Sequence, residues 1–190
     1  MNFKQLDITG FKSFSEKTTI LIENGLTGIV GPNGCGKSNI VESLRWCMGE
    51  NSAKSMRGSG MEDVIFSGTS NRPSKNISEV ALLLDNQDKS GPIQYKEFDE
   101  ISIKRKIEKD KGSKYYINDK EVRARDVQTF FADLSTGAHS PSLISQGRIG
   151  QLVTAKPIER KSILEEAAGI SGIHARRQEA ETRLNAAENN

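Results

Sequence analysis

The chain has 190 residues, of which 35% are hydrophobic and 27% are charged, enough for one globular domain or a domain with an extension. Its formal net charge of +2 does not by itself indicate a nucleic-acid-binding protein, although positive charges can still cluster locally. The N-terminal stretch lacks the apolar core of a signal peptide, and no run reaches the length of a membrane span. Cys35 and Cys47 lack the spacing of a zinc site. We therefore expect a soluble cytoplasmic protein with no membrane partner.

Two short segments near the N-terminus have the pattern of paired strands. Residues 2–11 loosely alternate apolar and polar side chains, and residues 18–22 are expected to form the antiparallel partner. The connecting segment begins GFKSF at Gly10. This hairpin precedes a glycine-rich loop, so Lys12 and Ser13 are candidates for contacting the base, ribose or phosphate of a ligand bound there.

The stretch IVGPNGCGKSN at 29–39 contains the spacing G-x-x-x-x-G-K-S. The apolar run LTGIV at 26–30 predicts a buried strand before it, and a helical pattern follows it, which is the context that a phosphate-binding loop requires. Backbone N–H groups of such a loop face phosphates, the lysine adds positive charge, and the hydroxyl ligates Mg²⁺. The predicted ligand is a nucleoside triphosphate with Mg²⁺, and an ordinary glycine-rich turn is the alternative. The predicted contacts are Gly31, Pro32, Asn33, Gly34, Cys35, Gly36, Lys37, Ser38 and Asn39.

The segment after this loop predicts a helix over 38–48. Four apolar residues have the spacing to face a sheet, and Trp46 and Cys47 widen the stripe. The four are Ile40, Val41, Leu44 and Met48. Residues 51–62 are small and polar and predict a loop.

Three further segments have strand composition, at 77–84, 100–108 and 114–118, and polar turns separate them. They predict an antiparallel lobe attached to the nucleotide-binding sheet. The segment at 100–108 places three isoleucines and Arg105 on one side and Lys104 and Lys106 on the other. That basic face is a candidate for contacting DNA phosphates together with Arg123 and Arg125, and a solvated sheet face is the alternative reading.

The last third of the chain predicts helices. Residues 124–134 carry Val127, Phe130, Phe131 and Leu134 at helical spacing, and residues 156–169 begin near a proline and end at a glycine. From Ile173 onward a seven-residue pattern runs for about two heptads, which permits a coiled coil without establishing one.

Several motifs together resemble the N-terminal head segment of bacterial SMC proteins, which are ABC-type chromosome-organising ATPases. These motifs are GFKSF, GPNGCGKSNIVESLRWCMGE, MRGSGMEDVIFSGT and SQGRI, and the resemblance runs from residue 1 to about residue 180. It implies an α/β P-loop NTPase fold: an ABC-ATPase-like half-head with an antiparallel β lobe and a C-terminal helix that starts a coiled coil. Residues 1–168 would form the N-terminal half of the head, and residues 169–190 the start of the arm.

The resemblance also implies roles for residues outside the phosphate loop. An arginine at the position of Arg57 lies beside the nucleotide in SMC-like proteins and is linked to DNA-stimulated hydrolysis, and Asp63 would border the same pocket. Gln146 matches the Q-loop glutamine, which reaches the magnesium and the attacking water. The implied catalytic residues are thus Lys37, Arg57 and Gln146, and the implied metal ligands are Ser38 and Gln146.

Two segments resemble ABC motifs in sequence, but we do not expect either to have the function of the motif it resembles. ALLLDN at 81–86 resembles the strand that ends in a magnesium-binding aspartate, but Asn86 stands where a catalytic glutamate would follow Asp85. LSTG at 134–137 resembles the LSGG signature, but no aspartate–glutamate strand comes after it.

The resemblance implies that the ATPase site is composite and that this fragment alone is inactive. The implied partners are the C-terminal head segment of the same protein, a second SMC chain in a homodimer, a kleisin-type subunit, and DNA bound without sequence specificity. The location implied is the nucleoid within the cytoplasm. Two alternatives remain: the head of a recombination or break-repair coiled-coil ATPase, and a non-hydrolytic module that dimerises on nucleotide.

Overall fold

The computed structural model describes residues 1–134, 150, 153–168, 177, 181, 184, 185 and 187. Its contacts divide the chain into two units, Met1–Val127 and Gln128–Asn190, which are described separately below. The predicted boundary between residues 168 and 169 stays a prediction.

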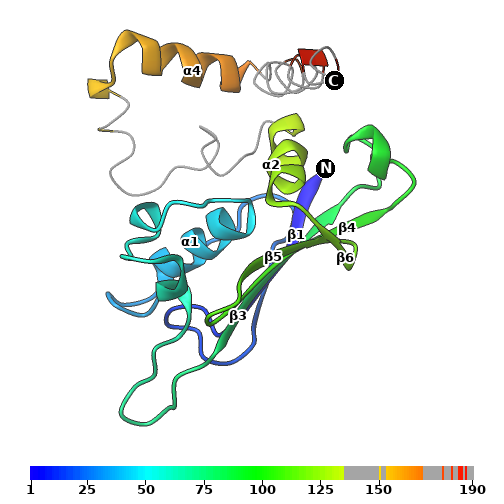
Figure 1. The fold of residues 1–190 in the computed structure, drawn as a ribbon. Helices are drawn as coiled ribbons and strands as arrows, with labels where there is room; N and C mark the ends of the chain where they lie inside the picture. Colours follow the sequence, from blue (N-terminus) through cyan, green and yellow to red (C-terminus); the bar gives the residue numbers. More distant parts are fainter. Residues whose placement is uncertain are drawn as a thin grey trace. The chain divides into compact units, whose positions relative to one another are not determined.

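The first unit is built on a single six-stranded sheet in which every neighbouring pair is antiparallel, in the order β2-β1-β3-β4-β5-β6 (Figure 1). The N-terminal hairpin and the predicted lobe join in this one sheet because β1 pairs directly with β3. The short strand β6 was not predicted. The strands are β1 (Asn2–Thr9), β2 (Thr18–Leu21), β3 (Ile77–Asp85), β4 (Glu100–Glu108), β5 (Gly112–Ile117) and β6 (Lys120–Val122).

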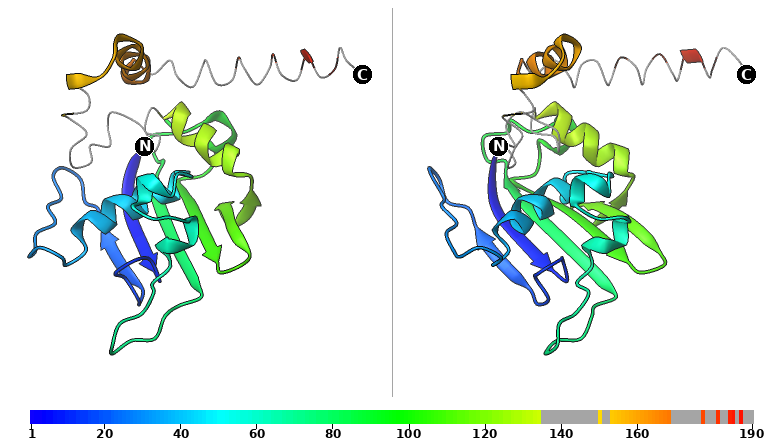
Figure 2. Two further views of the ribbon diagram at one scale, coloured as in Figure 1. Left: turned by 60° about the vertical axis from the view of Figure 1, so that its left-hand side comes forward. Right: turned by 90° about the vertical axis from the view of Figure 1, so that its left-hand side faces the viewer.

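The predicted helices are confirmed within a residue or two where the structure describes them. They are α1 (Lys37–Cys47), α2 (Ala124–Asp133) and α4 (Pro157–Ala167). Short 3₁₀ turns occupy Lys54–Met56, Met61–Val64 and Ile93–Tyr95. Figure 2 shows α1 lying across one face of the sheet. Gly169 and most of the predicted coil, from Ile173 onward, lie outside the described residues.

One face of the sheet carries the core of the first unit. Burial alternates along β3 and β4, as a period of two requires when one face is covered. Ile101, Ile103, Arg105 and Ile107 share one side of β4, as predicted, and all four are buried; Arg105 contacts Trp46 of α1. The helical spacing predicted for α2 is also confirmed, since Val127, Phe130 and Phe131 are buried.

The predicted buried stripe of α1 is confirmed at Trp46, Cys47 and Met48 and wrong at Val41. Ser43, Trp46 and Cys47 are buried, whereas Val41 is 37% exposed and Leu44 is half-buried. Trp46 packs on Phe11 with ring centroids 5.5 Å apart. The largest side chain sets the orientation of the helix, because burying an aromatic side chain removes more apolar surface from water than burying an aliphatic one.

The strand predicted at 26–30 is absent from the described part of the chain. These residues carry no strand pairing, and Leu26 is 99% exposed, Val30 94% and Ile29 47%. A buried strand needs a hydrogen-bonded neighbour, and no described residue pairs with this run, although β2 is an edge strand of the sheet. The apolar run therefore remains at the surface of this unit.

Arg105 fixes the C-terminal end of α1 to the sheet. Its guanidinium donates to the Trp46 carbonyl at 2.8 Å and to the Glu50 carbonyl at 2.6 Å. It also lies between two aromatic rings, 4.4 Å from the centroid of Trp46 and 4.6 Å from that of Tyr115. Burial lowers the pKa of Arg105 to about 10, which still leaves the side chain protonated at neutral pH.

We expect Arg105→Ala to lower the free energy of unfolding by about 3 kcal/mol or more, because it leaves buried carbonyls without donors and opens a cavity. Urea unfolding followed by the fluorescence of Trp46, the single tryptophan of the chain, measures this. Lys106→Ala, one residue along the same strand and on the opposite face, is the matched control and should change stability by about 0.5 kcal/mol or less. Equal effects of the two substitutions would contradict the role given to Arg105.

Candidate nucleotide-binding site

The loop before α1 has the geometry of an anion-binding loop. Gly34 and Gly36 have φ of 84° and 97°, a region that side chains other than glycine rarely occupy. Residues 31–35 are exposed, and Gly36 is the N-cap of α1 with no side-chain cap. The first turn of α1 contains no acidic residue, so the positive end of the helix is not neutralised there. These features suit a phosphate group.

Lys37 lies across this loop. Its ammonium donates to the carbonyls of Gly31 at 2.7 Å and Pro32 at 2.6 Å, so the charge is held beside the backbone that would surround a phosphate. The next residue, Ser38, is exposed in the first turn of α1. The residues present therefore fit a magnesium-bound triphosphate: backbone N–H groups, one ammonium, and one accessible hydroxyl.

The GFKSF turn packs directly against the end of the loop. A Cβ at Gly36 would lie 2.7 Å from the Ser13 hydroxyl, so only glycine allows this approach. The Ser13 hydroxyl also accepts from the side-chain amide of Asn39 at 2.8 Å. Lys12 adopts a left-handed φ of 47°, and its backbone N–H donates to the Val64 carbonyl at 2.7 Å. The structure thus brings Ser13, Gly36 and Asn39 together.

Glu42 joins two predicted site residues that are far apart in sequence. Its carboxylate bonds the ammonium of Lys12, which also donates to the Met56 carbonyl. The other carboxylate oxygen lies 2.5 Å from Nε of Arg57, whose Nη2 donates to Asn39 at 3.0 Å. The ammonium of Lys12 is therefore engaged by the protein, and its predicted nucleotide contact stays a prediction. The sequence carries no signal for Glu42, because its partners lie 30 and 15 positions away.

Asp63 lies in its own turn. Its carboxylate accepts from the backbone N–H groups of Ser59 at 2.7 Å and Gly60 at 3.0 Å, and from the Ser59 hydroxyl at 2.8 Å. The bond from Gly60 is the largest cause that holds the pKa of Asp63 below its usual range. The structure gives this residue a turn-forming role, and its proximity to a nucleotide stays a prediction.

Other predicted site features are only partly described. Gln146 and residues 135–137 of LSTG lie outside the described residues. Asn86 is fully buried, and its side chain binds the Tyr95 and Phe98 carbonyls at 3.2 and 2.8 Å and the Gly91 N–H at 2.9 Å. It therefore organises the loop after β3, and the expectation that 81–86 is not a catalytic strand stays a prediction.

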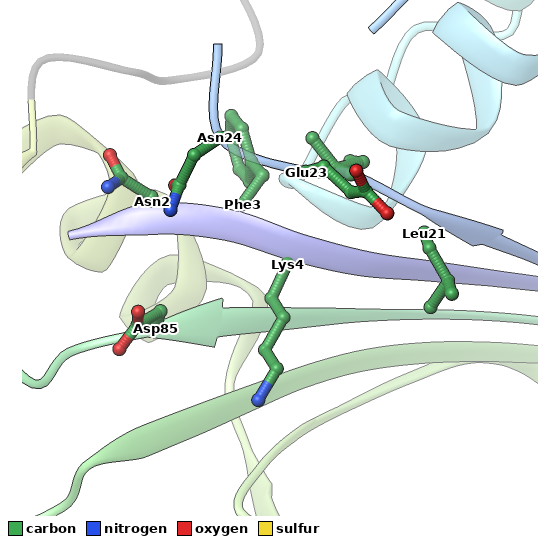
Figure 3. Close-up of a pocket in the computed structure, with 8 residues that line it drawn as sticks. Asn2, Phe3, Lys4, Leu21, Glu23, Asn24 and Asp85 are labelled. Atoms are coloured by element: carbon green, nitrogen blue, oxygen red, sulfur yellow. The ribbon is translucent and has the colours of Figure 1, made fainter.

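A cavity of about 500 Å³ lies apart from the phosphate loop, where the chain leaves β2 (Figure 3). None of the predicted site residues lines it, and its charged groups come from separate segments, with Lys4 paired to Glu100. We therefore do not assign it to the nucleotide. Its lining residues are Asn2, Phe3, Lys4, Leu21, Ile22, Glu23, Asn24 and Asp85.

The predicted basic face of the sheet is partly neutralised by its own neighbours. Lys104 lies 2.9 Å from Asp119, a hydrogen bond that raises the pKa of the lysine, and it also lies 5.8 Å from the centroid of the Tyr116 ring. Lys106 pairs in register with Glu79. These pairings reduce the positive potential that would attract phosphates. DNA contact by this face, with Arg123 and Arg125, stays a prediction.

Comparison with known proteins agrees with this fold. Residues 2–147 match the family model described as the RecF/RecN/SMC N terminal domain. The chain belongs to this family. It is 58% identical over all 190 residues to the chromosome partition protein Smc of Cereibacter sphaeroides, and 56% identical to that of Rhodopseudomonas palustris. In both cases the chain spans 16% of the relative's length.

Solved SMC heads share the fold. The structure of an Smc head bound to the C-terminal winged-helix domain of ScpA superposes with a TM-score of 0.83 at 32% identity, covering 90% of this chain and 52% of the other. A structure from work on ATP-driven dimerization and DNA-stimulated activation of SMC ATPases superposes with a TM-score of 0.75 at 32% identity. The match covers 88% of this chain and 99% of the other. This chain is thus the N-terminal segment of an SMC head, and the predicted mixed α/β half-head is confirmed. None of the helices in the described ranges has the length and apolar character needed to cross a bilayer.

The two cysteines should differ in reactivity. Cys35 is exposed in the phosphate loop, whereas burial raises the pKa of Cys47 to about 12, so its reactive thiolate is scarce at pH 8. We expect iodoacetamide to alkylate Cys35 in the native protein and Cys47 only after unfolding, as measured by peptide mass spectrometry. Mg-ATP should slow alkylation of Cys35 by covering the loop. An unchanged rate at saturating nucleotide would argue against phosphate binding there.

Proposed function

We propose that the chain is the ATP-binding N-terminal half of the head of a chromosome-partition SMC ATPase. The observation that carries this is the phosphate loop itself: two glycines at positive φ, Lys37 held across the loop, and an uncapped helix N-terminus. It occurs in a chain similar over its whole length to chromosome partition proteins.

The nucleotide site is shared with a second segment of the same protein. The solved Smc head bound to ScpA is about twice as long as the part that this chain covers. The apolar run at 26–30 precedes the phosphate loop and has no strand partner among the described residues. We infer that strands of a C-terminal head segment pair with it and bury it. That segment would also supply the magnesium-binding aspartate and the catalytic glutamate, which the described residues do not provide.

The chemistry of such a site is positioning and electrostatic stabilisation. Magnesium would neutralise charge on the phosphates, with Ser38 and Gln146 as its protein ligands on this side. Lys37 and the backbone N–H groups of the loop hold the phosphates, and the first turn of α1 points its positive end at them. Hydrolysis then requires a second head that closes over the nucleotide.

The partners follow from the same model. Two SMC chains would close as a homodimer over two nucleotides, and a kleisin-type subunit would bind the head, as ScpA binds the related Smc head. DNA would be bound without sequence specificity, and the protein would act on the nucleoid in the cytoplasm. The recombination and repair alternative has less support, because the curated relatives reported above are chromosome partition proteins.

We expect Lys37→Ala to abolish measurable Mg-ATP binding, since it removes the ammonium from the phosphate loop. The wild-type chain alone should bind nucleotide weakly and release phosphate negligibly. Titration with a fluorescent ATP analogue measures binding, and a phosphate-release assay measures hydrolysis. Steady phosphate release by the isolated 190-residue chain, lost in Lys37→Ala, would contradict the composite site.

We expect ATP to promote association when the chain is mixed with its matching C-terminal head segment. Size-exclusion chromatography with and without Mg-ATP tests this, and Lys37→Ala is the control. If ATP never promotes association in the mixture, the two-head model is wrong. An ATP-dependent dimer without phosphate release would instead favour the non-hydrolytic module.

Binding of the C-terminal segment should also protect the backbone of residues 26–30 from hydrogen exchange. These amides lie in an exposed segment, so pairing into a sheet should slow their exchange by several orders of magnitude. Hydrogen–deuterium exchange of the chain alone and in the complex measures it. The paired amides of β3 are the internal control and should change little; fast exchange of 26–30 in the complex would exclude strand pairing.

A further inference from the structure

One carboxylate beside the phosphate loop has two cationic partners. The side chain of Glu42 is only 12% exposed, and its two oxygens contact Lys12 and Arg57 separately. The two cations differ in exposure: the side chain of Lys12 is 14% exposed and that of Arg57 is 58% exposed. One partner is therefore enclosed, and the other reaches the surface.

The enclosed partner keeps Glu42 neutralised. Lys12 binds both Glu42 and the Met56 carbonyl, and its own turn is held by a backbone bond to Val64. A carboxylate this buried would be costly without a counter-charge. Because the enclosed Lys12 supplies the counter-charge of Glu42, Glu42 does not need Arg57 for neutralisation and can hold Arg57 as a second cation.

A short series of contacts connects the exposed partner, Arg57, to the phosphate loop. The Arg57 guanidinium donates to Asn39, whose amide donates to Ser13, and Ser13 lies against Gly36. Arg57 uses Nε and Nη2 for Glu42 and Asn39. A guanidinium has five N–H donors in a rigid fork, so donors remain for an anion.

The backbone of Arg57 adds a reason for the side-chain tether. This residue follows the 3₁₀ turn Lys54–Met56 with a left-handed φ of 55°, at the start of the exposed loop that continues to Gly60. A long side chain on such a loop samples many rotamers unless it is held, and ordering it during the reaction would cost conformational entropy. Two contacts from α1, at Asn39 and Glu42, fix it in advance.

We infer that Glu42 is a positioning residue that sets the guanidinium of Arg57 toward the terminal phosphate of a nucleotide in the loop. The inference rests on the proposed function. Arg57 would stabilise charge that develops on the phosphate as its bond breaks, and Glu42 would act only through Arg57. Such preorganised charge acts mainly on the chemical step.

The test is a double-mutant cycle in the full-length protein with Glu42→Gln, Arg57→Gln and the double variant. We expect each single substitution to lower kcat roughly tenfold with a much smaller change in KM for ATP. The double variant should be no slower than Arg57→Gln alone, because Glu42 has nothing left to position. Glu100→Gln, which neutralises the carboxylate paired with Lys4 away from the loop, is the matched control and should leave kcat within about twofold of the wild type.

Three outcomes would overturn the inference. The first is additive losses in the double variant, and the second is a Glu42→Gln effect confined to KM; both would indicate a purely structural role. The third is a faster Glu42→Gln variant, which would mean that Glu42 restrains Arg57 from the phosphate. Failure of the proposed function looks different: the wild type would then show no hydrolysis that Lys37→Ala removes.

Discussion

The position of α1 depends on the buried guanidinium of Arg105. Removing this charge from water is costly; the carbonyls of Trp46 and Glu50 accept its hydrogen bonds, two aromatic rings flank it, and the charge of Glu50 also favours its protonated form. A cation is also favourable at a helix C-terminus. Because α1 begins at the phosphate loop, the contact that fixes its far end also fixes the direction in which its first turn points.

The two ends of α1 are held by different chemistry. At the C-terminal end the contact is buried and its geometry is tight, since Arg105 lies between Trp46 and Tyr115. At the N-terminal end, Glu42 links the helix to the GFKSF turn through Lys12 and to the following loop through Arg57. The first arrangement resists movement, whereas the second includes an exposed cation that a bound anion can attract without uncovering a buried charge.

Features that depend on local sequence were predictable. The phosphate loop was predicted because it requires glycines at fixed spacing. The buried face of β4 was predicted because side chains on a strand alternate with a period of two. The buried face of α1 was predicted only in part: Trp46, Cys47 and Met48 are buried as expected, whereas Val41 is exposed. The contacts of Glu42 could not be predicted, since they join segments distant along the chain.

The segment at 26–30 shows why an apolar run is an incomplete signal. Its composition predicts a buried strand, but burial requires a neighbouring strand, and no described residue pairs with this segment. In the proposed model that neighbour is a strand of the C-terminal head segment.

The charges around the first turn of α1 suit this half of the head to phosphate binding rather than to hydrolysis. Lys12, Lys37 and Arg57 bring three positive charges, and Glu42 opposes them with one negative charge. This excess, added to the positive end of the helix, favours binding of phosphates. Among the described residues around the loop, the carboxylate of Glu42 is already paired with Lys12 and Arg57, and no group is assigned to activate water or to hold magnesium as an aspartate would. The half-head is thus electrostatically suited to binding phosphates. In the proposed model, hydrolysis requires the acidic groups of the second half.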